Sequence, residues 1–160
     1  MRTMLWCSIL ATALAAGGCK KKQDDTGSAA TEVKKTAEDV KDQAKDLDKT
    51  MTDKNAKPND IDKANADLAA AKTDLAAAKD KYAITVKDRL AKIDIKIHEL
   101  EARTDAKSKD ALATLQTRRT ELAAKTDGIK DRAAADWDAF TKDVDNTFDK
   151  LESDLNDALK

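Results

Sequence analysis

The sequence predicts an all-α fold: a long antiparallel helical hairpin of the coiled-coil kind, with an additional N-terminal amphipathic helix. Apolar residues recur at spacings of three and four along most of the chain, which is the period of a helix. Charged residues make up 38% of the 160 residues and aromatic residues only 3%, with four glycines and one proline. This profile is typical of long helices, because the abundant alanine buries too little area for a deep globular core.

The hairpin is predicted for residues 58–160 from two apolar stripes that flank a polar break at residues 104–109. The stripes comprise Val86, Leu90, Ile93, Ile97 and Leu100 before the break, and Leu112, Leu115 and Leu122 after it. Each set lies on one side of a helix, and the break is about as long as a tight helix-to-helix connection. We therefore place the turn near Ala106.

The second arm of the hairpin is expected to start near Ser108, and Gly128 could be either a C′ glycine that ends a helix or only a weak point. We favour one helix to the C-terminus with a kink at Gly128. Folding about the turn then sets Leu75 against Trp137 and the alanine-rich part of the first arm against the aromatic part of the second. Small residues facing large ones favour close packing of two helices. Ile95 lies off the main stripe, and we expect it to contact the N-terminal helix.

The N-terminal amphipathic helix is predicted for residues 31–57. Thr31 is a suitable N-cap, and the helix should end at Lys57, because Pro58 disfavours helical backbone in the residue before it. Its apolar seam consists of Val33, Ala37, Val40, Ala44, Leu47 and Met51. Half of these residues are small, so the helix needs a partner, which can be its own hairpin or another chain.

Residues 1–18 have the pattern of a secretory signal. One positive charge precedes an uncharged, mostly apolar run over residues 5–16, which is too short to span a bilayer. The run ends at Ala16-Gly17-Gly18-Cys19, which resembles the lipobox of bacterial lipoproteins, although that family usually has Leu where Ala16 stands. The resemblance implies cleavage before Cys19 and acylation of Cys19, for example with palmitate. An ordinary secretory cut near Ala15 is the alternative.

Residues 19–30 are expected to form a flexible tether between the lipid anchor and the first helix. Lys20 to Lys22 can bind anionic head groups beside the anchor, or serve only as a solvated part of the tether. Enterobacterial lipoproteins use Asp after the acylated cysteine as an inner-membrane signal. Lys20 stands at that position, so the resemblance implies a periplasm-facing lipoprotein of the cell envelope, in the outer membrane rather than the inner.

The stretch from Lys92 to Leu159 also resembles a group of bacterial coiled-coil proteins described as stress-response or hypothetical. The similarity lies in the run from Leu112 to Leu122, followed by Trp137, Phe140, Val144 and Phe148. It implies a helical hairpin without known chemistry.

Candidate chemistry is sparse. His98, the only histidine, has Asp94 and Glu101 on its helix face, but one imidazole and two carboxylates on a solvated face make a poor metal site. No second histidine or mature cysteine offers a nucleophile–base pair, and no glycine-rich loop cradles phosphate. We predict no enzyme, cofactor, metal or small-molecule substrate. The net charge of −1 with mixed signs also argues against nucleic-acid binding.

The stripe from Trp137 to Leu159 has an eleven-residue repeat and can either pack in the hairpin or lie on a membrane. Its acidic surroundings favour packing, because helices on anionic membranes usually have a basic face. The sequence thus leads us to expect a non-catalytic envelope lipoprotein acting as a helical scaffold. It contacts a membrane through its anchor, and proteins or its own copies through helical faces. The alternatives are a periplasmic binding module or stress-response holdase, and a tether to the cell wall through Lys160 that resembles murein lipoprotein.

Overall fold

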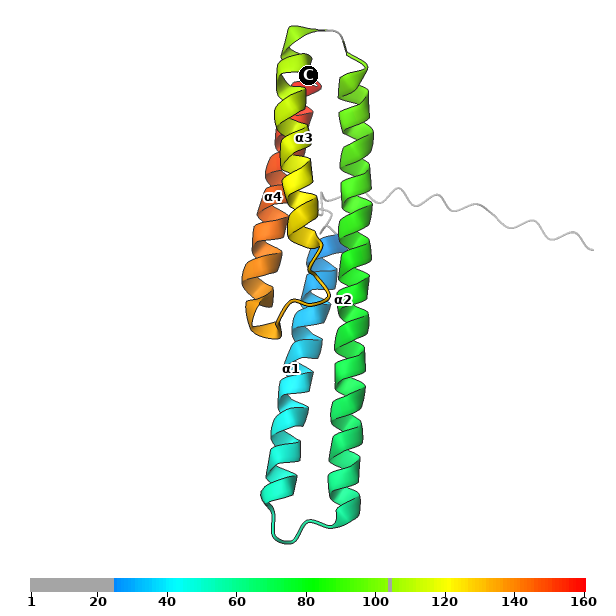
Figure 1. Cartoon of the computed structure of the whole chain (residues 1–160), viewed down its shortest axis with the longest axis vertical. Helices are drawn as coiled ribbons and strands as arrows, with labels where there is room; N and C mark the ends of the chain where they lie inside the picture. The colour runs from blue at the N-terminus through cyan, green and yellow to red at the C-terminus, as the bar shows by residue number, and fades with distance from the viewer. Residues whose placement is uncertain (1–24, 104) are drawn as a thin grey trace, which may run out of the picture.

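The computed structural model describes residues 25–103 and 105–160, which form an elongated all-α rod (Figure 1). The elements are α1 (Asp25–Thr52), α2 (Pro58–Glu101), α3 (Ala106–Thr126), the 3-10 turn η1 (Ala134–Asp136) and α4 (Trp137–Ala158). The described part of the chain contains no strand, so the predicted all-α class is confirmed. With 44 residues, α2 is about 66 Å long and runs the length of the rod.

Both ends of α2 are set by local chemistry. At its start, Pro58 occupies the first turn, where a missing N–H costs nothing, and the Asp60 carboxylate accepts a hydrogen bond from the Lys57 N–H at 3.0 Å. After its end, the chain reverses direction into α3 (Figure 1). Asp105 then caps α3, because its carboxylate accepts the Ser108 N–H at 2.9 Å and the Ser108 hydroxyl at 2.7 Å.

Helices α3 and α1 occupy successive lengths of α2. Beside the C-terminal part of α2, Asp94 pairs with Arg119 of α3 at 2.6 Å. Farther down, Lys81 pairs with Glu32 of α1 at 2.5 Å, and Arg89 donates to the Thr26 hydroxyl at 3.3 Å. Both helices are antiparallel to α2, and Figure 1 shows α3 above α1. The N-terminal helix therefore docks on its own chain.

The predicted continuous second arm is wrong. Helix α3 ends at Thr126, residues 127–133 form the connection, and α4 runs back beside α3 (Figure 1). Ile129 is buried in this connection, and the Lys79 ammonium donates to the carbonyls of Lys130 and Arg132 at 3.2 and 2.6 Å. The weak point predicted at Gly128 is thus a complete reversal of direction.

The reversal has a physical reason in the size of the α4 side chains. A continuous second arm would seat its aromatic residues in a seam between only two helices, which leaves large side chains partly exposed. In the observed fold the apolar stripe of α4 lies against α2, α3 and the start of α1, and its members from Trp137 to Leu155 are at most 8% exposed. The alanine-rich part of α2, which the predicted hairpin paired with the segment now seen as α4, is instead covered by α1.

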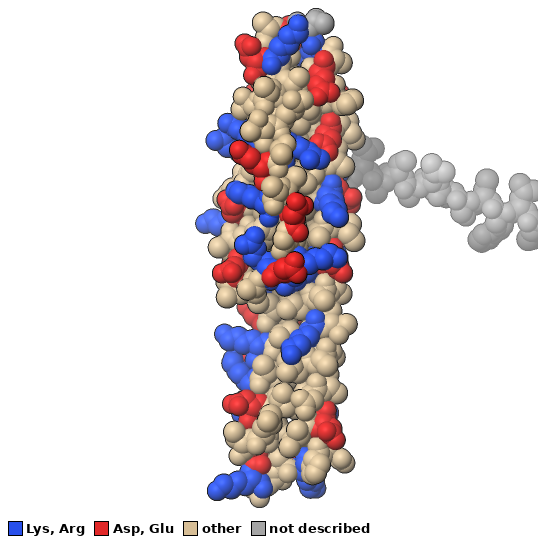
Figure 2. All heavy atoms as spheres, in the orientation of Figure 1, with Lys and Arg blue, Asp and Glu red and all other residues tan. Residues whose placement is uncertain are grey.

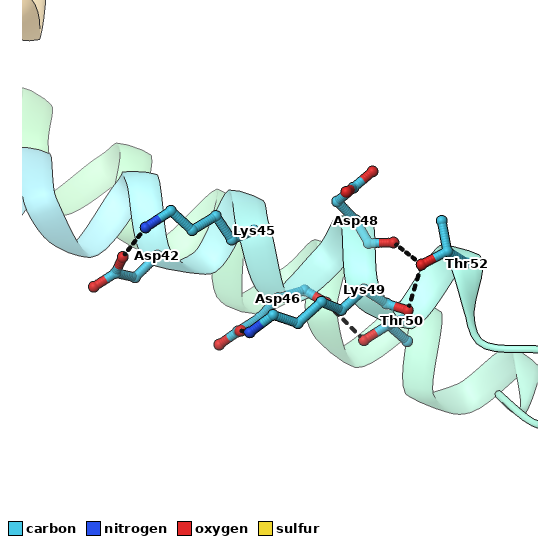
Figure 3. Close-up of polar contacts among 7 residues, drawn as sticks. All are labelled: Asp42, Lys45, Asp46, Asp48, Lys49, Thr50 and Thr52. Atoms are coloured by element: carbon cyan, nitrogen blue, oxygen red, sulfur yellow. Dashed lines mark hydrogen bonds and ion pairs between the residues drawn. The ribbon is translucent and has the colours of Figure 1, made fainter.

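The lower arm of the rod is a pair of helices with little core. Val40 and Leu47 of α1 are only half-buried, and Met51 is 65% exposed. Contacts within α1 support this arm (Figure 3): Lys45 pairs with Asp42 and Lys49 with Asp46, both at 3.1 Å. Pairs of this spacing add only tenths of a kcal/mol each, so the arm is the less stable half of the rod.

Two further expectations need correction, and a third holds. Residues 25–30, predicted as tether, are the first turns of α1, and residues 19–24 lie outside the described residues. Lys160 does not return toward Pro58: Arg103 beside the α2–α3 turn donates to the Leu159 carbonyl, which places the C-terminus at that end. The stripe from Trp137 to Leu159 is packed inside the rod, as predicted, and is not available to a membrane as one face.

Basic and acidic side chains are interspersed over the face shown in Figure 2, without a large area of one sign. Within the described ranges, none of the helices combines the length and the apolar character needed to cross a bilayer.

Candidate functional site

The predicted lipid-attachment residue, Cys19, lies outside the described residues. The structure does fix where the chain that follows it joins the rod. Helix α1 begins at Asp25, and the next residue, Thr26, is buried beside Arg89 of α2. Arg89 is 12 residues before the end of α2 and 31 after its start. At the helical rise these separations are about 18 and 47 Å, so the chain enters the side of the rod rather than either end.

Arg89 forms a polar centre inside the upper part of the rod. Its guanidinium is 2.7 Å from both Asp149 and Glu152 of α4, and 3.7 Å from Asp145. It also lies 4.5 Å from the centre of the Phe148 ring. Arginine suits this place because its planar group can bind several carboxylates and stack on an aromatic ring at once. The cluster joins α1, α2 and α4.

An aromatic cluster lies next to Arg89, where α1, α2 and α4 meet. Trp137 contacts Tyr82 and Phe140 with ring centres 5.1 and 5.6 Å apart, and its indole N–H donates to the Ala30 carbonyl at 3.3 Å. Tyr82 is fully buried. Burial, and then the charge of Asp145, raise the pKa of Tyr82, while Arg89 lowers it. The phenol therefore stays neutral at physiological pH. The sequence predicted Leu75 as the partner of Trp137, and the ring contact in the structure is with Tyr82, seven residues after Leu75 on the same helix.

The weak metal cluster considered around His98 does not assemble. Asp94 accepts hydrogen bonds from two guanidinium nitrogens of Arg119, Nε at 2.7 Å and Nη2 at 2.6 Å, which joins α2 to α3. His98 is largely exposed and pairs only with Glu101 of its own helix, at 3.1 Å. Among the described residues, no group of three or more metal-ligating side chains comes together.

The outward side of α2 carries exposed isoleucines. Ile84 and Ile95 are each 61% exposed, and they share one side of the helix with exposed Ala77 and Ala91. The expectation that Ile95 contacts the first helix is therefore wrong: α1 packs on the opposite side of α2 and reaches up only to the level of Arg89. Ile95 instead lines a shallow surface depression with Asp94, His98 and Glu99.

Sequence reasoning missed both Arg89 and this surface. Arg89 occupies a seam position, three residues after Val86 and four before Ile93, where a charged residue is unusual. That misplaced charge was the available signal. Ile84 and Ile95 are eleven residues apart, which is three helical turns, so their common side was also readable from the sequence.

Comparisons of the chain with protein-family models, with curated proteins and with solved structures find no match.

Proposed function

We propose that this chain is a non-catalytic lipoprotein of the bacterial cell envelope, a helical scaffold held at a membrane by acylated Cys19 and facing the periplasm. The observation that carries the proposal is the sequence around Cys19. An uncharged apolar run over residues 5–16 leads through Gly17-Gly18 to this cysteine, and the rod starts only six residues later, at Asp25.

The composition of the rod supports a scaffold rather than a catalyst. Its buried polar side chains are all used in structural contacts: Arg89 pairs with carboxylates of α4 and donates to Thr26, and Ser108 and Thr141 bond within their own turns. Its large apolar residues close a narrow core. In the lipoprotein family the anchored cysteine carries more than one acyl chain, and two or more chains make membrane attachment stable.

The test is lipidation and fractionation in bacterial cells. Cys19→Ala should abolish labelling by a fatty-acid analogue and release the protein from the membrane pellet. Cys7→Ala is the matched control, because Cys7 lies within the predicted signal and its loss should change neither result. Labelling and membrane association that persist in Cys19→Ala would refute the proposal.

A further inference from the structure

We infer that the rod lies side-on against the membrane, with the outward side of α2 facing the lipid head groups. We call this surface the α2 face, and define it by Ala77, Ile84, Ala91 and Ile95. The inference rests on the proposed lipid anchor at Cys19. Its occupant is a lipid surface, not a second protein.

The first argument is the length of chain between the anchor and the rod. Cys19 and Asp25 are six residues apart, so their Cα atoms are at most about 21 Å from each other even when the link is fully extended. The rod at Thr26 is therefore held close to the bilayer, because Thr26 contacts Arg89 and cannot move away from it without unpacking α1.

The same length excludes an upright rod standing on its lower end. The start of α2 is about 47 Å from the level of Arg89, more than twice the reach of the link. The C-terminal end of α2 is about 18 Å from the level of Arg89, and the α2–α3 turn extends beyond it. A rod standing on that end would therefore need the link to be fully extended. Side-on attachment needs less of the link than either end, since the link then has to pass only one helix from the level of Thr26.

The second argument selects the α2 face from the long sides of the rod. Ile84 and Ile95 lie on either side of the level of Arg89, which is the level where the link joins the rod. Both isoleucine side chains are 61% exposed, so their transfer from water into the head-group region lowers the free energy. From the level of Thr26, the link is long enough to pass around one helix, whose diameter is about 10 Å.

Charge supports the same choice. Helix α4, on the other side of the rod, has seven acidic residues against two lysines, so anionic head groups repel it. Helix α2 is nearly balanced, with nine acidic and eight basic residues. Asp88 is exposed on the α2 face itself, between Ile84 and Ala91, and is offset by exposed Lys87 beside it; the neighbouring Asp80 is already paired with Lys130 at 2.6 Å. Lys20 to Lys22 attract the anchored segment to the same anionic surface.

The experiment uses the acylated protein in vesicles of phosphatidylethanolamine and phosphatidylglycerol. Because Cys19 is blocked by its lipid and Cys7 leaves with the signal, one added cysteine is the only free thiol and can carry an environment-sensitive fluorophore. Ile84→Cys and Ile95→Cys report on the α2 face, and Asn146→Cys on the exposed side of α4. We expect a blue shift and quenching by spin-labelled lipids at positions 84 and 95, and neither at position 146.

A linker variant tests the role of chain length, and further outcomes test the occupant. Inserting a long Gly-Ser segment after Lys22 should weaken quenching at positions 84 and 95 while the protein stays anchored. Water-like emission at both positions in anchored protein would overturn the inference. So would a blue shift that spin-labelled lipids leave unquenched and that grows with protein density, because a second copy would then cover the face. A chain that carries no acyl group and leaves the vesicles would instead refute the proposed function.

Discussion

Trp137→Ala tests whether α4 folds back into the rod. Trp137 is 1% exposed, makes edge and tilted contacts with Tyr82 and Phe140, and donates a hydrogen bond to the Ala30 carbonyl. Its truncation leaves a cavity among three helices, and such Trp→Ala changes cost about 3–5 kcal/mol. Because the substitution also removes the stacking of the indole on two rings, we expect the free energy of unfolding to fall by about 4 kcal/mol.

The assay is urea unfolding followed by circular dichroism, with the chain starting at residue 20. Trp137→Phe is the matched control, because it retains an aromatic ring but loses the hydrogen bond to Ala30. It should lower the free energy of unfolding by about 1–2 kcal/mol. In a continuous second arm the indole would lie in a half-wet seam of two helices, and its loss would cost about 2 kcal/mol or less. A loss that small in Trp137→Ala, with an unchanged dependence on urea concentration, would refute the observed packing.

The other predictions use the same soluble chain, in which Trp137 is the only tryptophan and reports unfolding by its fluorescence. Arg89→Met should lower the free energy of unfolding by about 2 kcal/mol. The loss is smaller than for a fully buried ion pair, because the three carboxylates that remain are 34–67% exposed and regain water. An unchanged free energy of unfolding would mean that the cluster does not join the helices. The Ser108 side chain and N–H, together with Arg103, lower the pKa of Asp105 to about 2. This carboxylate therefore stabilises the fold above pH 4 and loses its effect as the pH falls from 4 to 2, so the urea midpoint of Asp105→Asn should fall less over that range than that of the unmodified chain. Cysteines replacing Lys34 and Asp138, whose charged groups are 2.7 Å apart, should crosslink within one chain, and crosslinks only between chains would contradict the docking of α1 on α4.

The local part of the structure was readable from the sequence. The period of the apolar residues identified helices, Pro58 marked the start of α2, and the polar stretch before Ser108 marked the reversal into α3. These features depend on interactions within a few residues, such as the Asp105 cap on Ser108. The sequence around Cys19 is local in the same sense, and it supplies the hypothesis of a lipid anchor.

The path of the chain after Thr126 was decided only by tertiary packing. Two arrangements compete for the alanine-rich side of α2: the extended second arm, or α1 with α4 folded back. The period of the apolar residues does not distinguish these two arrangements, because the α4 segment has a single apolar stripe in either of them. The second arrangement prevails because it surrounds Trp137 and Phe148 on several sides. It also pairs the seam charge of Arg89 with Asp149 and Glu152 of α4, 60 and 63 residues away in sequence, which helical spacing alone cannot reveal.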